Sequence, residues 1–307
     1  MGVRAKDSLV YLVYGQGPHN DEAVFSILSA LHLMGRDRSQ YRIVVYTDHP
    51  NAFGGLPVHT EILSASVLHE WSGPLGFNHR RKIVVVKHAL QRFGGRVLLC
   101  DSDTWFVKHP KTAFARVGPG RAVMHVAEYY LSDRCASAVA DSLAGHTFRD
   151  RAGSRWSIGA TTVMFNSGLI GVHESDVLAL DEALHLTDQM YVHARFLTIE
   201  QLAFSVCLQH YTKLRQSYDV VYHYWPPAHR ALFGSHLSRV LREKTLPSRE
   251  AQFHALVPFA PRLPVQPFQW GTQSVARRLW GRTRGLTRRL TKRAAIWLAW
   301  AVHVVAS

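Results

Sequence analysis

Apolar residues follow two different spacings in the first hundred positions. Short runs rich in β-branched and aromatic residues lie at 8–15, 41–48 and 96–103, and each ends in Gly or Asp. Between them, 20–35 and 79–95 carry apolar residues at helical spacing and close on glycine. The order strand, helix, strand, helix, strand predicts a parallel sheet with crossover helices, hence an α/β fold.

The second half of the pattern is less regular. It predicts, in order, a strand at 121–128, a helix with a loop at 131–154, a turn through glycine at 161–173, amphipathic helices at 175–186 and 198–211, and a short strand at 219–225. Four prolines within 257–267 break this pattern and predict a stiff, irregular linker. We therefore divide the chain into a domain at 1–257, a proline-rich linker at 258–270 and a tail at 271–307.

The charge of the chain is concentrated in that tail. The formal net charge is +14, and 271–307 holds eight Lys or Arg residues and no Asp or Glu. Leucines and tryptophans alternate with the arginines at helical spacing, and the final apolar run is too short to span a bilayer. We expect a basic amphipathic helix on an anionic membrane surface rather than a nucleic-acid-binding segment, with a partner-binding helix as the other alternative.

Cysteine usage and the N-terminus bear on the compartment. The three cysteines, Cys100, Cys135 and Cys207, lack the spacing of a disulfide framework or a zinc site. The chain enters its first strand within ten residues, without the apolar core of a signal peptide. These features predict a cytoplasmic protein that associates peripherally with the inner face of the membrane.

The best candidate for chemistry is "VLLCDSDTWF", where Asp101 and Asp103 follow a buried strand. Carboxyl ends of parallel strands form the ligand edge of such sheets, and two carboxylates there suit Mg²⁺ or Mn²⁺. Asp-Ser-Asp after a strand is also ordinary turn chemistry. An aspartate-dependent phosphatase is a third alternative, but Trp105 occupies the position at which that motif requires threonine.

Four further segments accompany this motif in order along the chain: "HRRK" at 79–82, "FNSGLIG" at 165–171, "IEQLAFS" at 199–205 and "VYHYW" at 221–225. Together they resemble the GT-A-fold glycosyltransferases, particularly the family 8-like group, over roughly 8–225. The resemblance implies a Rossmann-like domain, a hexosyltransferase activity that leans toward retention, and a nucleotide diphosphate sugar as donor.

The resemblance also implies residue roles. Asp103 would be the principal metal ligand, and Asp101 would contact both the metal and the nucleotide ribose. His223 would be the third ligand, with a packing histidine as an equal alternative. Lys82 or its neighbour Arg81 would contact the donor phosphates, with a solvated helix face as the alternative. The family's glycine and lysine after that histidine are absent from "HYWPPAHR".

The remaining implied roles concern the donor sugar and the nucleobase. Glu200 would act on the donor sugar, with Gln201 beside it; Asp188 and Gln189 form a competing acidic-Gln pair. Asn166 would hydrogen-bond a sugar hydroxyl or cap its own turn. The nucleobase would lie near the strand ends, beside Tyr14, Gly15 and Asp48. All three positions are also ordinary turn positions.

These observations predict a metal-dependent glycosyltransferase. It would move a sugar, UDP-linked in preference, to a glycan or lipid-linked glycan at a membrane surface. A catalytically inactive nucleotide-sugar or glycan-binding module tethered to membrane is the alternative from another functional class.

Overall fold

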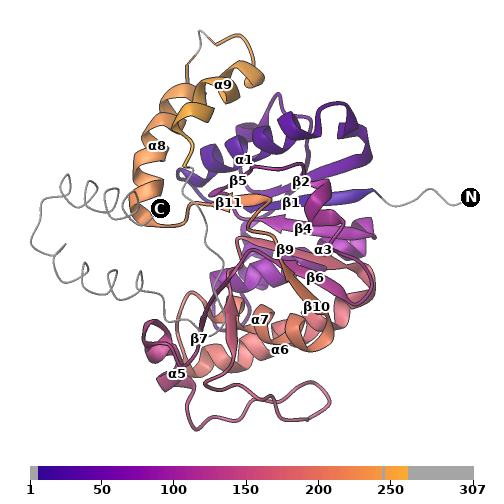
Figure 1. Cartoon of the computed structure of the whole chain (residues 1–307), viewed down its shortest axis with the longest axis vertical. Coiled ribbons are helices and arrows are strands. Elements are labelled where there is room, and N and C mark those ends of the chain that lie inside the picture. The colour runs from indigo at the N-terminus through magenta and orange to yellow at the C-terminus, as the bar shows by residue number, and fades with distance from the viewer. Residues whose placement is uncertain (1–5, 244–245, 262–307) are drawn as a thin grey trace, which may run out of the picture. The chain divides into compact units, whose positions relative to one another are not determined.

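A seven-stranded sheet lies at the centre of the computed structural model, which describes residues 6–243 and 246–261 (Figure 1). The strand order is β10-β6-β9-β4-β1-β2-β3. The bounds are β1 Asp7–Val13, β2 Tyr41–Thr47, β3 His59–Ile62, β4 Arg96–Cys100, β6 Arg121–Met124, β9 Leu169–His173 and β10 Lys213–Gln216. Neighbouring strands are parallel except where β9 inserts antiparallel between β4 and β6.

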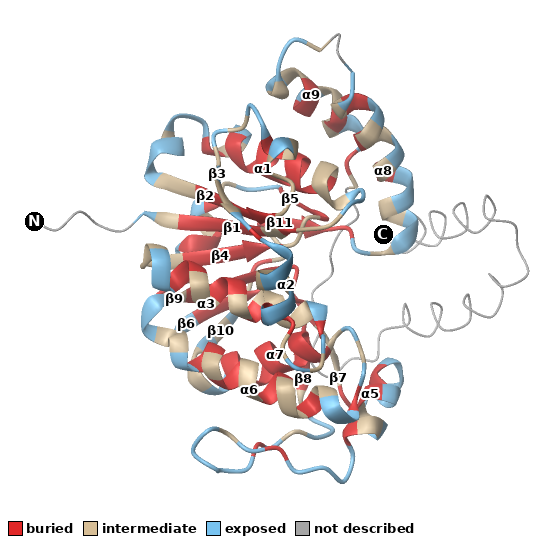
Figure 2. Cartoon of the chain, turned by 180° about the vertical axis from the view of Figure 1, so that it is seen from behind, coloured by how far each residue is buried: buried red, intermediate tan, exposed pale blue. Residues whose placement is uncertain are grey.

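Two groups of helices flank this sheet. Helices α1 (His19–Met34), α8 (Pro227–Leu241) and α9 (Arg249–Leu256) pack on one another, as do α3 (Arg81–Phe93), α6 (Val177–His193) and α7 (Ile199–Tyr211). Leu9, Tyr11 and Val13 of β1 share a buried cluster with α1, so the intervening residues point to the opposite face, where α3 packs. The buried residues line both faces of the sheet (Figure 2). The expected α/β fold with a mainly parallel, helix-flanked sheet is confirmed.

The elements predicted from apolar spacing form where it was strongest. The helix predicted at 20–35 runs from His19 to Met34 and ends because Gly35 adopts a φ of +49°. Its backbone N–H donates to the Leu31 carbonyl, which caps the last turn. The strands at 8–15, 41–48 and 96–103 and the later helices are present, with ends shifted by a few residues.

The single strand predicted at 121–128 is wrong. The chain leaves the large sheet after β6, and β7 (Ala127–Tyr130) pairs with β8 (Val163–Phe165) in a separate two-stranded sheet. The break occurs because His125 N–H donates to the Asn166 carbonyl, while Asn166 N–H donates to the Val126 carbonyl. This crossover brings Glu128 to the Asn166 side chain.

A second small sheet joins distant parts of the sequence. Strand β5 (Thr104–Phe106) pairs antiparallel with β11 (Val221–His223), the core of the strand predicted at 219–225. Thr104 lies opposite His223 in this register. The pairing therefore places the late histidine beside the two aspartates.

Shorter elements complete the described chain. They are α2 Ala65–Trp71, α4 Lys111–Phe114 and α5 Ser137–Leu143. The segment predicted to be an irregular linker opens with a short 3-10 turn over Val257–Phe259, and Ala260 is buried. The rest of the linker and the basic tail at 271–307 lie outside the described residues.

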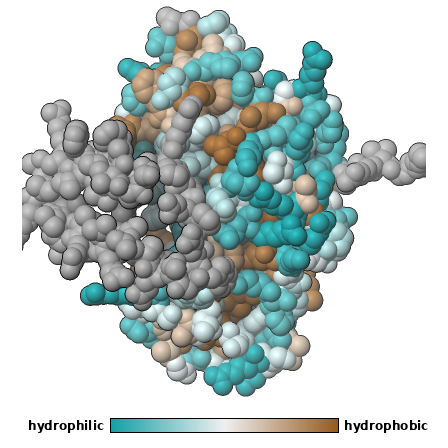
Figure 3. All heavy atoms as spheres, in the orientation of Figure 1, coloured by the Kyte–Doolittle hydropathy of each residue, from teal (hydrophilic) through white to brown (hydrophobic). Residues whose placement is uncertain are grey.

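The surface of this unit is mixed. In the view of Figure 3, hydrophilic side chains cover most of the described surface and hydrophobic ones form separate patches. Among the described helices, none combines the length and the apolar character needed to cross a bilayer.

Candidate metal and donor site

The two aspartates lie in a tight connection between β4 and β5. Asp101 N–H donates to the Gly168 carbonyl at 3.0 Å, and Thr104 Oγ1 donates to the Asp101 carbonyl at 2.7 Å. The segment is thus a hydrogen-bonded turn, which is the alternative to a metal site that the sequence left open for Asp-Ser-Asp. That turn sits at the carboxyl end of the central strand β4, so the turn and a ligand site at the sheet edge are compatible.

His223 joins the aspartates. Its Nε2 lies 3.2 Å from Asp103 Oδ1 and 4.0 Å from Asp101 Oδ2. One ligand atom from each of the three residues lies within 4.8 Å of the others. His223 and Asp103 are buried, and Asp101 keeps partial exposure. The structure therefore brings together the three residues that the sequence nominated as metal ligands.

Asn166 sets the orientation of the His223 ring. Its Oδ1 accepts the Gly168 N–H at 2.9 Å, which identifies that atom as the oxygen. The same oxygen lies 2.8 Å from His223 Nδ1, so Nδ1 carries a proton and donates it. Nε2 is left to face the aspartates. A histidine whose second nitrogen is held in this way is typical of metal ligands.

Gly168 makes this contact possible. A Cβ added there would overlap the His223 ring. The first glycine of "FNSGLIG" is therefore required, because the imidazole approaches the backbone closely at that position.

Lys82 links the aspartates to α7. Its Nζ donates to Asp101 Oδ2 at 2.6 Å and to Ser167 Oγ at 3.2 Å, and it lies 3.7 Å from Glu200 Oε1. Ser167 Oγ in turn donates to Glu200 Oε1 at 3.1 Å. Glu200 Oε2 is buried without a hydrogen-bond partner among the described residues. One oxygen of this buried carboxylate therefore lacks a protein hydrogen-bond donor in the described part of the chain.

Gln201 and Asn166 share a partner that sequence reasoning missed. Glu128 accepts hydrogen bonds from Asn166 Nδ2 and Gln201 Nε2, each at 3.0 Å. Gln201 Oε1 accepts from the Ser167 backbone N–H at 3.0 Å. Both amide side chains thus have protein partners at their oxygen and nitrogen, which suits them to hold the site in place. Glu128 had no local signal, because it follows the unforeseen break after β6.

The electrostatics of this centre are strongly coupled. Burial alone would raise the pKa of Asp103, but the adjacent His223 and Arg230 hold it well below its usual value. Burial would lower the pKa of His223, and the carboxylate of Asp103 raises it instead. Burial likewise opposes the charge of Lys82, whose pKa Asp101 and Glu200 raise. The site is an ionised cluster of carboxylates and cations.

His125 contrasts with His223. Burial and the nearby His223 lower the pKa of His125 to about 3, and its Nε2 donates to the Val221 carbonyl at 2.9 Å. This histidine is uncharged at neutral pH, so it adds no cation beside His223.

Arg230, from α8, is a further cation that the sequence did not single out. It forms a two-point ion pair with the buried Glu22 of α1, at 2.9 and 2.6 Å. Its remaining terminal nitrogen lies 3.4 Å from Asp103 Oδ2. The residue follows "HYWPPAH", where the expected lysine is missing, so it places a positive charge at the metal-ligand edge by another route.

The residues predicted to lie near the nucleobase follow the ends of β1 and β2. Gly15 N–H donates to both carboxylate oxygens of Asp48 at 3.0 Å. The Arg81 guanidinium lies over the Tyr14 ring, with its Cζ 4.5 Å from the ring centroid. The four residues therefore form one rim, made by two neighbouring parallel strands and the start of α3.

The competing acidic-Gln pair is engaged elsewhere. Asp188 pairs with Arg80 at 2.7 and 3.0 Å, and Gln189 hydrogen-bonds the Arg149 backbone. Neither contacts the aspartates or His223. Of the two pairs, Glu200 and Gln201 are the ones that meet the site.

The three possible metal ligands fit a divalent cation. Two carboxylates and one imidazole with its second nitrogen fixed are the ligands that Mn²⁺ accepts, and Mg²⁺ accepts the carboxylates. Asp101, Asp103 and His223 would hold the ion.

Comparisons with known proteins show a likeness to solved structures and no match by sequence. No protein-family model and no curated protein matches this sequence. Among solved structures, the bifunctional glycosyltransferase WbbM in its apo form is similar, with a TM-score of 0.45 and 10% sequence identity. The match covers 69% of this chain and 39% of that one. The chain thus spans well under half the length of that protein, and a likeness at this level assigns no function.

Proposed function

We propose that the protein is a metal-dependent glycosyltransferase that uses a nucleotide diphosphate sugar, with UDP-sugars preferred. The observation that carries the proposal is the convergence of Asp101, Asp103 and His223 at the carboxyl edge of β4, with Lys82 and Arg230 beside them. Two carboxylates, one oriented imidazole and two cations form a receptor for a metal-bound diphosphate.

The chemistry divides between the ion and the chain. When bound, a divalent cation supplies charge neutralisation for the departing diphosphate. Arg230 and Lys82 lie where they can hydrogen-bond phosphate oxygens and stabilise the same leaving group. Glu200, whose Oε1 lies 3.7 Å from Lys82 Nζ, would add negative charge beside the sugar, where a carboxylate stabilises positive charge that develops at the anomeric carbon.

Asn166 and Gln201 receive a different role from the one the resemblance implied. Each is committed to protein partners, so we assign them to positioning. Asn166 orients His223, and Gln201 holds Ser167 and Glu128 beside Glu200. We assign the nucleobase to the rim formed by Tyr14, Gly15, Asp48 and Arg81.

The acceptor is proposed to be a glycan or lipid-linked glycan at a membrane surface. This part rests on the basic, tryptophan-bearing stretch at 271–307, which lies outside the described residues. The same stretch supports a peripheral location at the inner face of the membrane.

Donor hydrolysis and transfer test the proposal. A thermal-shift screen of UDP-, GDP- and CMP-sugars with and without Mn²⁺ first identifies a donor, because a ligand that binds the folded state raises Tm. Turnover of that donor should vanish with EDTA and return with Mn²⁺. Asp103→Asn should abolish turnover, whereas Asp141→Asn, on exposed α5, should not.

The outcomes separate the alternatives. Normal turnover by the Asp103→Asn chain overturns the proposal. Metal-dependent nucleotide binding without turnover favours the inactive binding module. A covalent phosphate on Asp101 would identify the phosphatase instead.

A further inference from the structure

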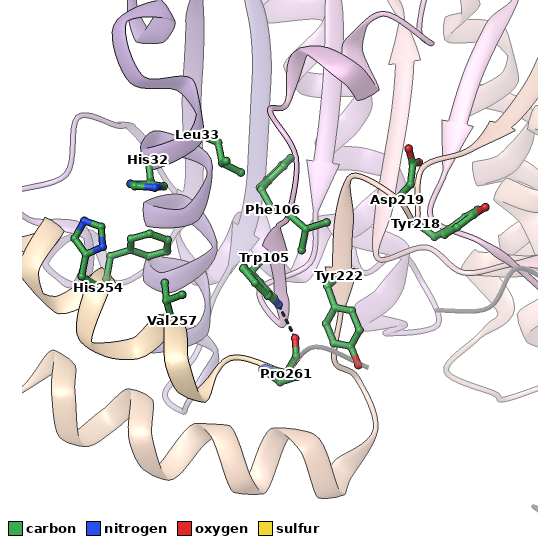
Figure 4. A pocket seen from close by; sticks show the side chains of 12 residues that line it. His32, Leu33, Trp105, Phe106, Tyr218, Asp219, Tyr222, His254, Val257 and Pro261 are labelled. Carbon is green, nitrogen blue, oxygen red and sulfur yellow. Dashed lines mark hydrogen bonds between the residues drawn. The ribbon is translucent and has the colours of Figure 1, made fainter. Parts of the chain in front are cut away.

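A second group of metal-ligating side chains lies where α9 packs on α1. His32 comes from the last turns of α1, and Glu250 and His254 lie one turn apart on α9. One ligand atom from each lies within 4.8 Å of the others. All three side chains are exposed, and none takes part in the candidate donor site. The ring centroids of His32 and His254 are 5.2 Å apart, and Figure 4 shows both at one end of a pocket.

We propose that His32, Glu250 and His254 bind a divalent transition-metal ion of the zinc type, which ties α9 to α1. Two imidazoles and one carboxylate favour Zn²⁺ over Mg²⁺ and Mn²⁺, which prefer oxygen ligands. The candidate donor site has the reverse composition, with two carboxylates and one imidazole. The two sites therefore select different metals.

The geometry requires only side-chain adjustment. Ligand atoms on one zinc ion lie about 2.0–2.2 Å from the metal, so neighbouring ligands are a few ångströms apart. His254 Nε2 and Glu250 Oε1 are already 4.0 Å apart, as their i, i+4 spacing provides. Their side chains are 58% and 69% exposed and can rotate without repacking the core. Three protein ligands in an exposed position leave the fourth to water.

The backbone beneath the site is well anchored. Phe253, between the two α9 ligands, is buried and packs on His32 and Phe25 of α1, with ring centroids 5.0 and 5.7 Å apart. This contact fixes the register of α9 against α1. The ion would therefore bind a preformed cluster and add a cross-link between the helices.

The cross-link has a structural consequence. His32 and His254 also line an apolar cavity of about 610 Å³, which extends to Trp105 and Tyr222 on β5 and β11 (Figure 4). Those strands carry Thr104 and His223 at the donor site. An ion that joins α1 to α9 thus fixes one wall of the cavity behind that site.

The test measures zinc binding by the full chain, independently of turnover. The Asp103→Asn background weakens the first metal site, and Mg²⁺ in excess occupies oxygen-rich sites. In this background, His32→Ala and His254→Ala should each lower Zn²⁺ affinity by about tenfold or more, because each removes a direct ligand. His69→Ala, an exposed histidine on α2, is the matched control for the many other histidines. Hydrogen exchange of α9 amides should slow with Zn²⁺ in the control only.

The outcomes are decisive for the bridge. Equal Zn²⁺ affinity in His32→Ala and His69→Ala chains overturns the proposal, even if His254→Ala weakens binding, because the ion would then not join the helices. Glu250→Gln guards against misfolding, since it keeps the shape of an exposed residue while removing its charge. That variant must also weaken Zn²⁺ binding, and unchanged affinity counts against the site.

Discussion

At the scale of single residues, the site depends on how His223 is held. Its Nδ1 donates to Asn166, and its ring lies against Gly168, which no larger residue can replace without overlap. Nε2, the atom that faces the aspartates, is thus oriented by residues nearly sixty positions away in the sequence. Loss of this support should impair metal binding while the fold persists.

Gly168→Ala tests the steric part. The added methyl group must displace His223, so Mn²⁺ affinity measured by electron paramagnetic resonance should fall by at least about tenfold. Gly234→Ala is the control, since its Cβ meets open space in the middle of α8. That substitution should leave binding unchanged and stabilise the helix by about 0.5–1 kcal/mol. Equal Mn²⁺ binding by both variants would refute the steric argument.

Asn166→Ala tests the hydrogen-bonding part. It removes the acceptor of His223 Nδ1 and leaves Glu128 without one of its donors. Loss of such a partner typically costs 10- to 100-fold, so we expect a decrease of roughly that size in Mn²⁺ affinity. Titration of the folded variant, checked by circular dichroism, measures it. If Mn²⁺ affinity is preserved while donor affinity falls, Asn166 contacts the sugar instead.

At the scale of elements, helix α8 lies outside the sheet and brings a cation to the site. The chain turns after β11 and returns Arg230 to Glu22 of α1 and to Asp103. Glu22 is only 1% exposed, so its carboxylate depends on this guanidinium. Arg230 therefore pairs with a buried carboxylate and also lies beside a candidate metal ligand.

Arg230→Ala should be costly in both respects. Its removal leaves the buried Glu22 carboxylate without its cation, and because the Arg230 side chain is itself 38% exposed, we expect a loss near the low end of the range for buried pairs, about 2–3 kcal/mol. Urea unfolding measures this loss. Arg230→Lys restores charge but not the two-point geometry, so stability should recover only in part. Arg239→Ala, exposed near the end of α8, should change neither stability nor turnover.

At the scale of the whole molecule, ion pairs fasten the strand that carries His223. Asp219, just before β11, accepts from both terminal nitrogens of Arg116 at 2.6 and 2.8 Å and from Lys108 at 3.1 Å. The hydrogen bonds from Arg116 lower the pKa of Asp219 to about 2. Because the pKa is depressed in the folded state, the stabilisation is present above the ordinary value of 3.8 and disappears as the pH falls toward 2.

Asp219→Asn should show that dependence. At pH 7 it should lower the free energy of unfolding by about 1–2 kcal/mol, less than the pKa shift alone gives because the pair is partly exposed. The difference from the unsubstituted chain should shrink as the pH falls from about 4 to 2. Denaturant titrations at several pH values check this, and a difference that is constant with pH would exclude the ion pair as its cause.

The tail is a separate question at this scale. A chain that ends at Pro267 retains every described residue, including Pro261, whose carbonyl accepts the Trp105 indole N–H. Full-length protein should pellet with anionic liposomes, and the shortened chain should not, because the basic stretch is removed. Equal pelleting by the two chains would show that the tail is not the membrane-binding segment.

The amino-acid sequence alone specifies the alternation of strands and helices and the position of Asp101 and Asp103 at the end of a strand. Apolar periodicity is a local property, and a carboxylate pair after a buried strand must lie at the end of that strand. The motif order also nominated Lys82, Glu200 and His223, which the structure brings to one place. The fold class was within reach for the same reason.

Which of those residues lie together depends on how the elements pack in three dimensions. Whether His223 packs or faces the aspartates depends on the pairing of β5 with β11 and on Asn166, both set by distant segments. The break at His125, the partner Glu128 and the return of Arg230 have no local signal, since each arises from contacts across the fold. Local spacing specifies elements, whereas the geometry of a site is the outcome of how they pack.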